Sequence, residues 1–124
     1  MDTRYRILIV DDSLLMRKII TDIVNAAGHE VIGEASNGKD SIDLYRKLRP
    51  DLVAMDIIMP VMDGIAAVKE LKKIDPNCLI VMISAMGQQQ QVIEAIEAGA
   101  KDFIVKPFEP ERVVSAIKRI MENR

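Results

Sequence analysis

Short apolar runs and amphipathic segments alternate along the whole chain. Five runs rich in β-branched residues are too short for helices, and most are apolar on both faces, as buried parallel strands require. They cover residues 6–10, 30–35, 51–55, 78–84 and 102–105. This alternation predicts a strand-helix unit that is repeated five times.

Apolar residues between these runs recur every three or four positions, which is typical of one face of a helix. Ser13 is placed to cap the first helix, and Gly28 and Gly99 are placed to end the first and the fourth. Three apolar stripes support this prediction: Leu15, Ile19, Ile23 and Ala27; Ile65, Val68 and Leu71; and Val113, Ile117 and Met121.

Two prolines help to place the remaining helices. Residues 41–50 favour a helix because Leu44 and Leu48 have helical spacing and Pro50 would end it. Pro110 stands near the start of the last helix, where its missing N–H does no harm.

Parallel strands joined by short right-handed crossovers must have helices on both faces of the sheet. The predicted fold class is therefore α/β: a doubly wound, flavodoxin-like (βα)5 domain with a five-stranded parallel sheet. Its strand order, 2-1-3-4-5, is adopted from known proteins of this type. With 124 residues, 49% of them hydrophobic, and no visible linker, we expect a single domain over residues 1–124.

Composition excludes several function classes. The formal net charge of −2 gives no basic excess for holding nucleic-acid phosphates, so no nucleic-acid partner is expected. The first residues do not resemble a signal peptide, and no apolar run approaches the length of a membrane span. We therefore expect a cytoplasmic protein that does not bind a membrane, and we expect a monomer.

Polar residues follow four of the predicted strands. Asp11 and Asp12 end the first, Asp56 the third, Ser84 the fourth and Lys106 the fifth. The carboxyl ends of parallel strands meet at one edge of the sheet, so these side chains should meet there. Two carboxylates about 4 Å apart repel by roughly 4 kcal/mol at an effective dielectric near 20, so a compensating cation is expected among them.

The residue types limit the chemistry of this edge. Carboxylate oxygens are the ligands that Mg²⁺ prefers, and the sequence offers no second histidine for a zinc-like site. Aspartate is a nucleophile that forms acyl phosphates, and Asp56 is the best candidate for that role. Lys106 would then pair with a phosphoryl oxygen, and the Ser84 hydroxyl would donate a hydrogen bond to another.

Four motifs, "VDDS", "MDIIMPVMDG", "ISAMG" and "GAKDFIVKPF", together resemble the receiver domain of two-component response regulators, with a match from about residue 6 to residue 121. The resemblance implies that Asp12, Asp56 and the backbone carbonyl of Ile58 bind Mg²⁺ directly and that Asp11 assists through water. It implies that Asp56 accepts phosphate from a histidine kinase. It also implies a cis peptide bond between Lys106 and Pro107.

The resemblance also implies a switch. Phosphate on Asp56 would draw Ser84 towards it, and Phe103 would fill the space behind the serine, although Phe103 could equally be ordinary core. Ile58 and Met86 occupy positions that flank the path of the hydrolytic water in the family. Neither side chain can orient water, so we predict slow self-dephosphorylation. The alternative is that both residues only fill space at the site.

The output of such a switch is expected to be a partner protein, because no effector domain follows the last predicted helix. The region from Ser84 to Phe108 is most similar to stand-alone chemotaxis regulators of the CheY type. That similarity implies a CheA-like histidine kinase as the phosphate donor. It also implies that a flagellar motor switch protein or another effector binds the face of the fourth helix, fifth strand and fifth helix. A phosphatase is a further partner in some members of the family. The protein would be a phospho-acceptor rather than an enzyme.

Other readings of the sequence stay open at this point. The chain could be the receiver of a phosphorelay protein, or of a transcription factor without its output domain. A phosphohydrolase of the haloacid-dehalogenase type would need an Asp-x-Asp pair, whereas Ile57 and Ile58 follow Asp56. A nucleotide or flavin binder would need a phosphate loop after the first strand, where Asp11 and Asp12 would repel phosphate.

Overall fold

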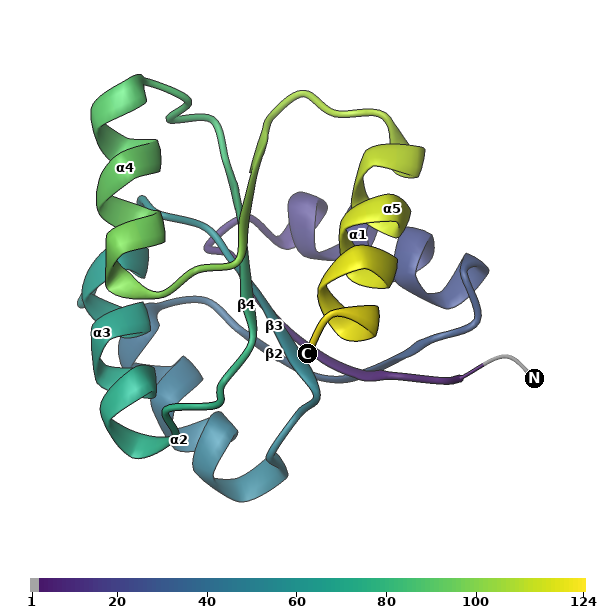
Figure 1. Ribbon diagram of the computed structural model, residues 1–124, viewed down its shortest axis with the longest axis horizontal. Coiled ribbons are helices and arrows are strands. Elements are labelled where there is room, and N and C mark those ends of the chain that lie inside the picture. Colours follow the sequence, from purple (N-terminus) through teal and green to yellow (C-terminus); the bar gives the residue numbers. More distant parts are fainter. Residues whose placement is uncertain (1–2) are drawn as a thin grey trace.

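The computed structural model describes residues 3–124 and contains five strands and five helices in strict alternation (Figure 1). The strands are β1 (Arg6–Val10), β2 (Glu30–Ala35), β3 (Leu52–Met55), β4 (Ile80–Ser84) and β5 (Asp102–Val105). The helices are α1 (Leu14–Ala26), α2 (Gly38–Leu48), α3 (Gly64–Ile74), α4 (Gln89–Ala98) and α5 (Pro110–Glu122). The predicted alternation is confirmed, with strand limits that differ by no more than two residues.

All four strand pairs are parallel, and the order across the sheet is β2-β1-β3-β4-β5. This confirms the predicted doubly wound fold class. The register places Val10 beside Met55 and Ser84 beside Val105, so the strands end at the same level. Residues that directly follow β1, β3 and β5 are therefore brought to one edge of the sheet, which we call the acid edge.

Two hydrophobic clusters fill the space between the sheet and its helices. One joins the sheet to α2, α3 and α4, and the other joins it to α1 and α5, so the helices form one layer on each face (Figure 1). Side chains of successive strand residues alternate between the clusters, as the pleat requires: Leu8 and Val10 enter the first, Ile7 and Ile9 the second. Burial on both faces explains why these strands are apolar throughout.

All three predicted apolar stripes mark helices, but in α1 only Ile23 of the stripe packs against the core. Val68 and Leu71 are buried in α3, as are Val113, Ile117 and Met121 in α5. In α1 the buried residues are Ile20 and Val24, whereas Leu15 is 70% exposed and Ile19 is also exposed. Spacing by four identified the helix but selected a face rotated by about one residue, or roughly 100°.

The predicted helix ends are confirmed. Ser13 accepts a hydrogen bond from the backbone N–H of Met16, and α1 is followed by Gly28 with φ of 89°. Gly99 caps α4 with φ of 123°, a conformation in which glycine avoids the strain of a Cβ atom. Within residues 3–124, none of the helices combines the length and apolar character that crossing a bilayer needs.

Candidate functional site

The acid edge brings three carboxylates together. Asp11 and Asp12 directly follow β1, and Asp56 directly follows β3; an oxygen atom from each lies within 4.8 Å of the other two. Asp11 is only 2% exposed and Asp56 only 8%, whereas Asp12 faces solvent. Burial in a low dielectric strengthens the repulsion between these acids, so the fold must hold positive charge beside them.

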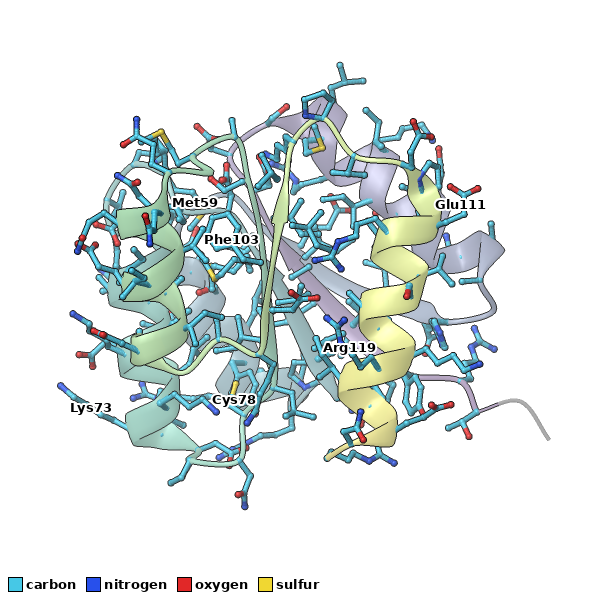
Figure 2. All side chains as sticks on the ribbon, turned by 45° about the horizontal axis from the view of Figure 1, so that its top comes forward. Met59, Lys73, Cys78, Phe103, Glu111 and Arg119 are labelled. Atoms are coloured by element: carbon cyan, nitrogen blue, oxygen red, sulfur yellow. The ribbon has the colours of Figure 1, made fainter. Side chains whose placement is uncertain are left out.

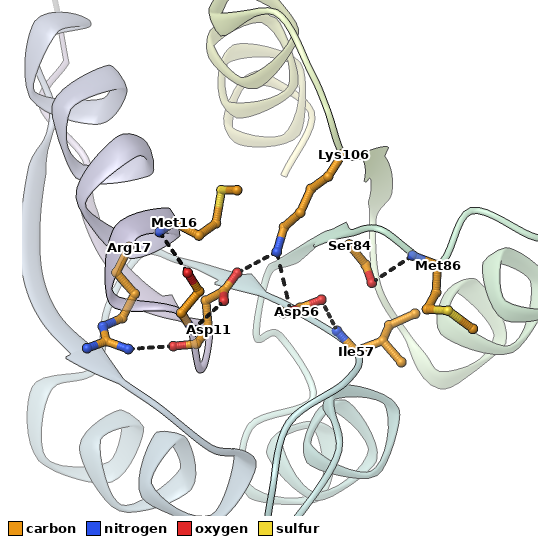
Figure 3. Close-up of polar contacts among 9 residues, drawn as sticks. Asp11, Met16, Arg17, Asp56, Ile57, Ser84, Met86 and Lys106 are labelled. Carbon is orange, nitrogen blue, oxygen red and sulfur yellow. Dashed lines mark hydrogen bonds and ion pairs between the residues drawn. The ribbon is translucent and has the colours of Figure 1, made fainter.

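Lys106 supplies that charge. It directly follows β5, and its Nζ atom lies 2.7 Å from Oδ2 of Asp11 and 3.4 Å from Oδ2 of Asp56 (Figure 3). The lysine side chain is only 13% exposed, so the ammonium group is held between the two carboxylates with little access to water. Part of the compensating charge therefore comes from a residue 95 positions away from Asp11, whereas the sequence pattern predicted magnesium in this role and assigned Lys106 to a phosphoryl oxygen.

The acid edge carries three carboxylates and the single ammonium group of Lys106, so the charge is only partly compensated. Backbone N–H groups stabilise part of the remainder: Ser13 donates to Oδ1 of Asp11 at 2.9 Å, and Ile57 donates to Oδ1 of Asp56 at 2.8 Å. The Asp12 carboxylate makes no hydrogen bond or ion pair within the described residues 3–124. A set of carboxylate oxygens with one member still free suits a hard divalent cation such as Mg²⁺.

Ser84 comes to the same edge but does not bond to the acids. Its buried Oγ atom accepts a hydrogen bond from the backbone N–H of Met86 at 3.2 Å (Figure 3). Met86 is half-buried and packs against the core under α4, while Ile58, two residues after Asp56, is exposed. Neither of these last two side chains carries a group that could bind or activate water.

Phe103 and Pro107 lie on either side of Lys106. The Phe103 ring is buried in the core on the α4 side of the sheet, in the same cluster as Met59 (Figure 2). The peptide bond between Lys106 and Pro107 is cis, the isomer that the resemblance implies.

Two residues that support the site were missed by sequence reasoning. Gly64 begins α3, and a Cβ atom there would lie 1.9 Å from the carbonyl oxygen of Asp56, so only glycine fits. Arg17 lies one turn into α1 and donates from Nη1 to the carbonyl oxygen of Asp11 at 2.7 Å and from Nε to Glu34 at 3.0 Å. The Asp-Gly pair before α3 was a usable signal for Gly64; nothing in the sequence marks Arg17.

The fold and this edge define a doubly wound α/β domain with an acidic, lysine-bridged cluster at the carboxyl ends of its strands. The chain belongs to the response regulator receiver domain family, whose model matches residues 7–118. This agrees with the resemblance carried by the four sequence motifs.

Several known proteins resemble the chain over nearly its whole length. The chemotaxis protein CheY of Thermotoga maritima is 59% identical over 93% of this chain and 96% of that protein. CheY of Bacillus subtilis is 56% identical over 94% of this chain and 98% of that protein. Among solved structures, the complex of CheX, CheY, BeF3 and magnesium from Borrelia burgdorferi matches with a TM-score of 0.92 and 35% identity, covering 94% of this chain and 89% of that one.

Proposed function

We propose that the protein is a phosphorylation-activated signalling switch in which Asp56 accepts a phosphoryl group in a Mg²⁺-dependent reaction. The observation that carries the proposal is the position of Lys106, whose ammonium group touches both Asp11 and Asp56 at the rim of the three-carboxylate cluster. Three carboxylates beside one ammonium group leave an excess of negative charge, which suits a site that binds a metal ion and then a phosphoryl group.

In this proposal Asp12, Asp56 and the backbone carbonyl of Ile58 hold Mg²⁺, and Asp11 assists through water. The three carboxylates fit the ion because their oxygens converge within 4.8 Å and Asp12 is free of other partners among the described residues. Bound Mg²⁺ would neutralise charge on the incoming phosphoryl oxygens. The chain is therefore a phospho-acceptor that assists its own modification, rather than an enzyme with turnover.

Asp56 is the proposed acceptor because its carboxylate lies within 4.8 Å of the Asp11 and Asp12 oxygens and 3.4 Å from Nζ of Lys106, so both a metal ion and the lysine can reach a phosphoryl group on it. In the transfer, the phosphorus–nitrogen bond of a phosphohistidine breaks as a phosphorus–oxygen bond forms to an Oδ atom of Asp56. The imidazole nitrogen keeps the electron pair and takes up a proton. Lys106 would move its ammonium group from the carboxylates to a phosphoryl oxygen, so its charge stabilises the product.

Ser84 and Phe103 are proposed to carry the change away from Asp56. Turning the Ser84 hydroxyl from the Met86 N–H towards the phosphoryl group would gain a charge-assisted hydrogen bond in a buried place. Phe103 is already buried here, so its role is a change of packing under α4 rather than an entry from solvent. Moving a two-state switch from 1:99 to 99:1 needs about 5.5 kcal/mol of differential stabilisation.

Ile58 and Met86 are proposed to make the phosphorylated state long-lived, because neither can direct water at the acyl phosphate. The Ile58→Asn, Met86→Glu double variant should lose phosphate faster than the unchanged protein, measured as the decay of the phosphorylated mass. Equal decay rates would contradict this role and leave the acceptor role of Asp56 intact.

The donor is proposed to be a CheA-like histidine kinase. The most exposed large apolar side chains in residues 3–124 gather near the acids along the chain, since Leu14 and Leu15 follow Asp12 and Ile58 and Val61 follow Asp56. Exposed apolar side chains beside a polar site are typical of protein interfaces. We therefore expect the phosphate donor that contacts these four side chains to be a protein rather than a small molecule alone.

The effector is proposed to be a flagellar motor switch protein that binds the face of α4, β5 and α5. Exposed apolar side chains on α4 and β5, namely Ile93, Ile96 and Val105, support this face. The full-length match to two stand-alone chemotaxis proteins favours this reading over a phosphorelay or transcription-factor receiver. Binding of a motor-switch peptide with and without a phosphoryl mimic tests it, and no difference between the two states would contradict it.

The acceptor role is tested by adding a small acyl phosphate to the purified protein and measuring its intact mass. We expect one phosphoryl group per chain with Mg²⁺, none with a chelator and none in the Asp56→Asn variant. Asp75→Asn is the matched control and should be phosphorylated normally. Phosphorylation of Asp56→Asn to the same extent would overturn the proposal.

A further inference from the structure

A cavity of about 540 Å³ lies at the end of the sheet opposite the acid edge. It is bounded by the end of α3, the starts of β4 and β5 and the end of α5. Its volume falls within the range of about 300–1,000 Å³ that is common for small-molecule sites. Figure 2 shows Arg119 between α5 and the sheet, and Cys78 near the start of β4, at this end of the molecule. We call this cavity the basic pocket.

The basic pocket concentrates positive charge in a protein whose net charge is negative. Four of its lining residues are cationic, namely Lys72, Lys101, Arg119 and Arg124, and none of the residues that line it is acidic. The guanidinium group of Arg124 stacks on the Tyr5 ring, so the charge available in the pocket comes from the other three. The chain as a whole has 19 acidic and 17 basic side chains. An excess of one sign in a concave region raises the local concentration of ions of the opposite sign.

Lys72 is held in place by the fold. Its Nζ atom donates hydrogen bonds to the carbonyl oxygens of Cys78, at 2.5 Å, and Pro76, at 3.4 Å. Its methylene groups pack against Gly99, where a Cβ atom would lie 2.7 Å from Cε. An ammonium group has three donors, so one remains for a ligand. Lys72 makes no ion pair with any residue in the part of the chain that the structure describes.

The neighbouring cations are also incompletely neutralised. Arg119 and Arg112 share a single carboxylate, that of Asp102, so one positive charge remains in this group. Lys101 is exposed and makes no ion pair with residues 3–124. Guanidinium and ammonium groups arranged around one space suit a ligand with several anionic oxygens.

The pocket also has apolar walls. Leu79 is half-buried and Ile120 is buried, and both line the same space as the cations. A purely inorganic anion would leave this surface without a partner, whereas a ligand with an aromatic or aliphatic body would cover it.

We propose that the basic pocket binds a small phosphate-bearing molecule of about nucleotide size. Its phosphates contact Lys72, Lys101 and Arg119, and its apolar body packs on Leu79 and Ile120. This site is separate from the acid edge, so the inference does not depend on the proposed function.

The experiment titrates the full chain separately with ADP, pyrophosphate and adenosine and follows the backbone amide resonances by NMR. A chelator is present, so that no metal ion at the acid edge can bind the nucleotide. ADP should shift the amides of Leu79, Lys101 and Ile120, and should bind more tightly than pyrophosphate or adenosine. Lys101→Glu should weaken ADP binding by about tenfold, because it replaces attraction by repulsion at close range.

Lys73→Glu is the matched control, since it makes the same charge change on α3. Figure 2 shows Lys73 on the outer side of α3, away from Arg119, and its ion pair within residues 3–124 is with Glu70. We expect less than about a twofold effect from it, because solvent and salt screen a distant exposed charge. The inference is overturned by equal weakening in both variants, by shifts confined to the acid edge, or by no saturable binding of ADP.

Discussion

The carboxylates at the two ends of the sheet differ in how much positive charge lies beside them. At the acid edge, the Lys106 ammonium group pairs with Asp11 and Asp56, and Asp12 has no ion-pair partner among residues 3–124. At the opposite end, Asp102 alone receives two guanidinium groups, from Arg112 and Arg119, together with the backbone N–H of Phe103.

Asp75 at that opposite end is also fully partnered. It accepts hydrogen bonds from the Tyr45 hydroxyl at 2.7 Å and the Asn77 N–H at 3.0 Å, and Arg49 lies 3.6 Å away. Carboxylates that stabilise a fold are paired, whereas those that bind a ligand are left short of positive charge. The contrast supports the proposal that the carboxylates of the acid edge bind a ligand, and it does so without reference to any relative.

The largest effect is expected from Gly64→Ala at the acid edge. A Cβ atom would lie 1.9 Å from the carbonyl oxygen of Asp56, and backbone cannot move aside as a side chain can. We expect the free energy of unfolding to fall by about 3 kcal/mol, measured by chemical denaturation. Gly33→Ala, which meets only the ends of Leu48 and Leu8, is the control and should lose less. Equal losses would show that the acid edge is not unusually tight.

Asp102→Asn should destabilise the protein. The change removes the negative charge between Arg112 and Arg119 and weakens hydrogen bonds to a charged acceptor. The expected loss is about 2 kcal/mol in the free energy of unfolding at neutral pH. A stability equal to that of the unchanged protein would mean that this acid is as poorly compensated as those at the acid edge.

Asp56→Asn should stabilise the protein, whereas Asp102→Asn destabilises it. The same chemical change here relieves repulsion among three carboxylates served by one lysine, and we expect about 1 kcal/mol of added stability in the absence of divalent cations. Denaturation curves with a chelator present give the comparison. If Asp56→Asn and Asp102→Asn both destabilise, the difference between the two ends is lost.

Lowering the pH should destabilise the protein through Asp75 and Asp102, at the end opposite the acid edge. This effect should be smaller than those of the substitutions above. The Tyr45 hydrogen bond lowers the pKa of Asp75 below its ordinary 3.8. For Asp102, burial alone would raise the pKa, but bonds from Arg112 and Phe103 hold it below 3.8. A lowered folded-state pKa gives stability that is present above pH 3.8 and is lost as pH falls through the folded value. The Asp75→Asn, Asp102→Asn variant should lose less stability between about pH 5 and pH 3; an unchanged slope would assign the pH dependence to other acids.

The sequence predicted the residues that meet at the acid edge because parallel strands end at one edge whatever their details. The position of Lys106 between Asp11 and Asp56 follows from that rule and from the two oppositely charged residue types. The Asp-Gly pair marks Gly64 as a turn or helix-start residue, but its role beside Asp56 depends on how closely α3 approaches that residue, a distance that no spacing encodes.

Two other features were beyond sequence reasoning for physical reasons. Apolar spacing in α1 could not separate Leu15, which is exposed at the first turn, from Ile20, which reaches the sheet. The basic pocket collects Lys72 from α3, Lys101 from the turn before β5 and Arg119 from α5, with no common motif, so only the folded chain brings them together.

The effect of Mg²⁺ on stability tests most directly whether the acid edge is short of positive charge in order to bind a cation. A ligand that binds the folded state stabilises it by RT ln(1 + [L]/Kd). Adding MgCl₂ should raise the unfolding midpoint of the unchanged protein and of Asp75→Asn, and should have little effect on Asp12→Asn. An equal rise in Asp12→Asn, or no rise in the unchanged protein, would contradict this account.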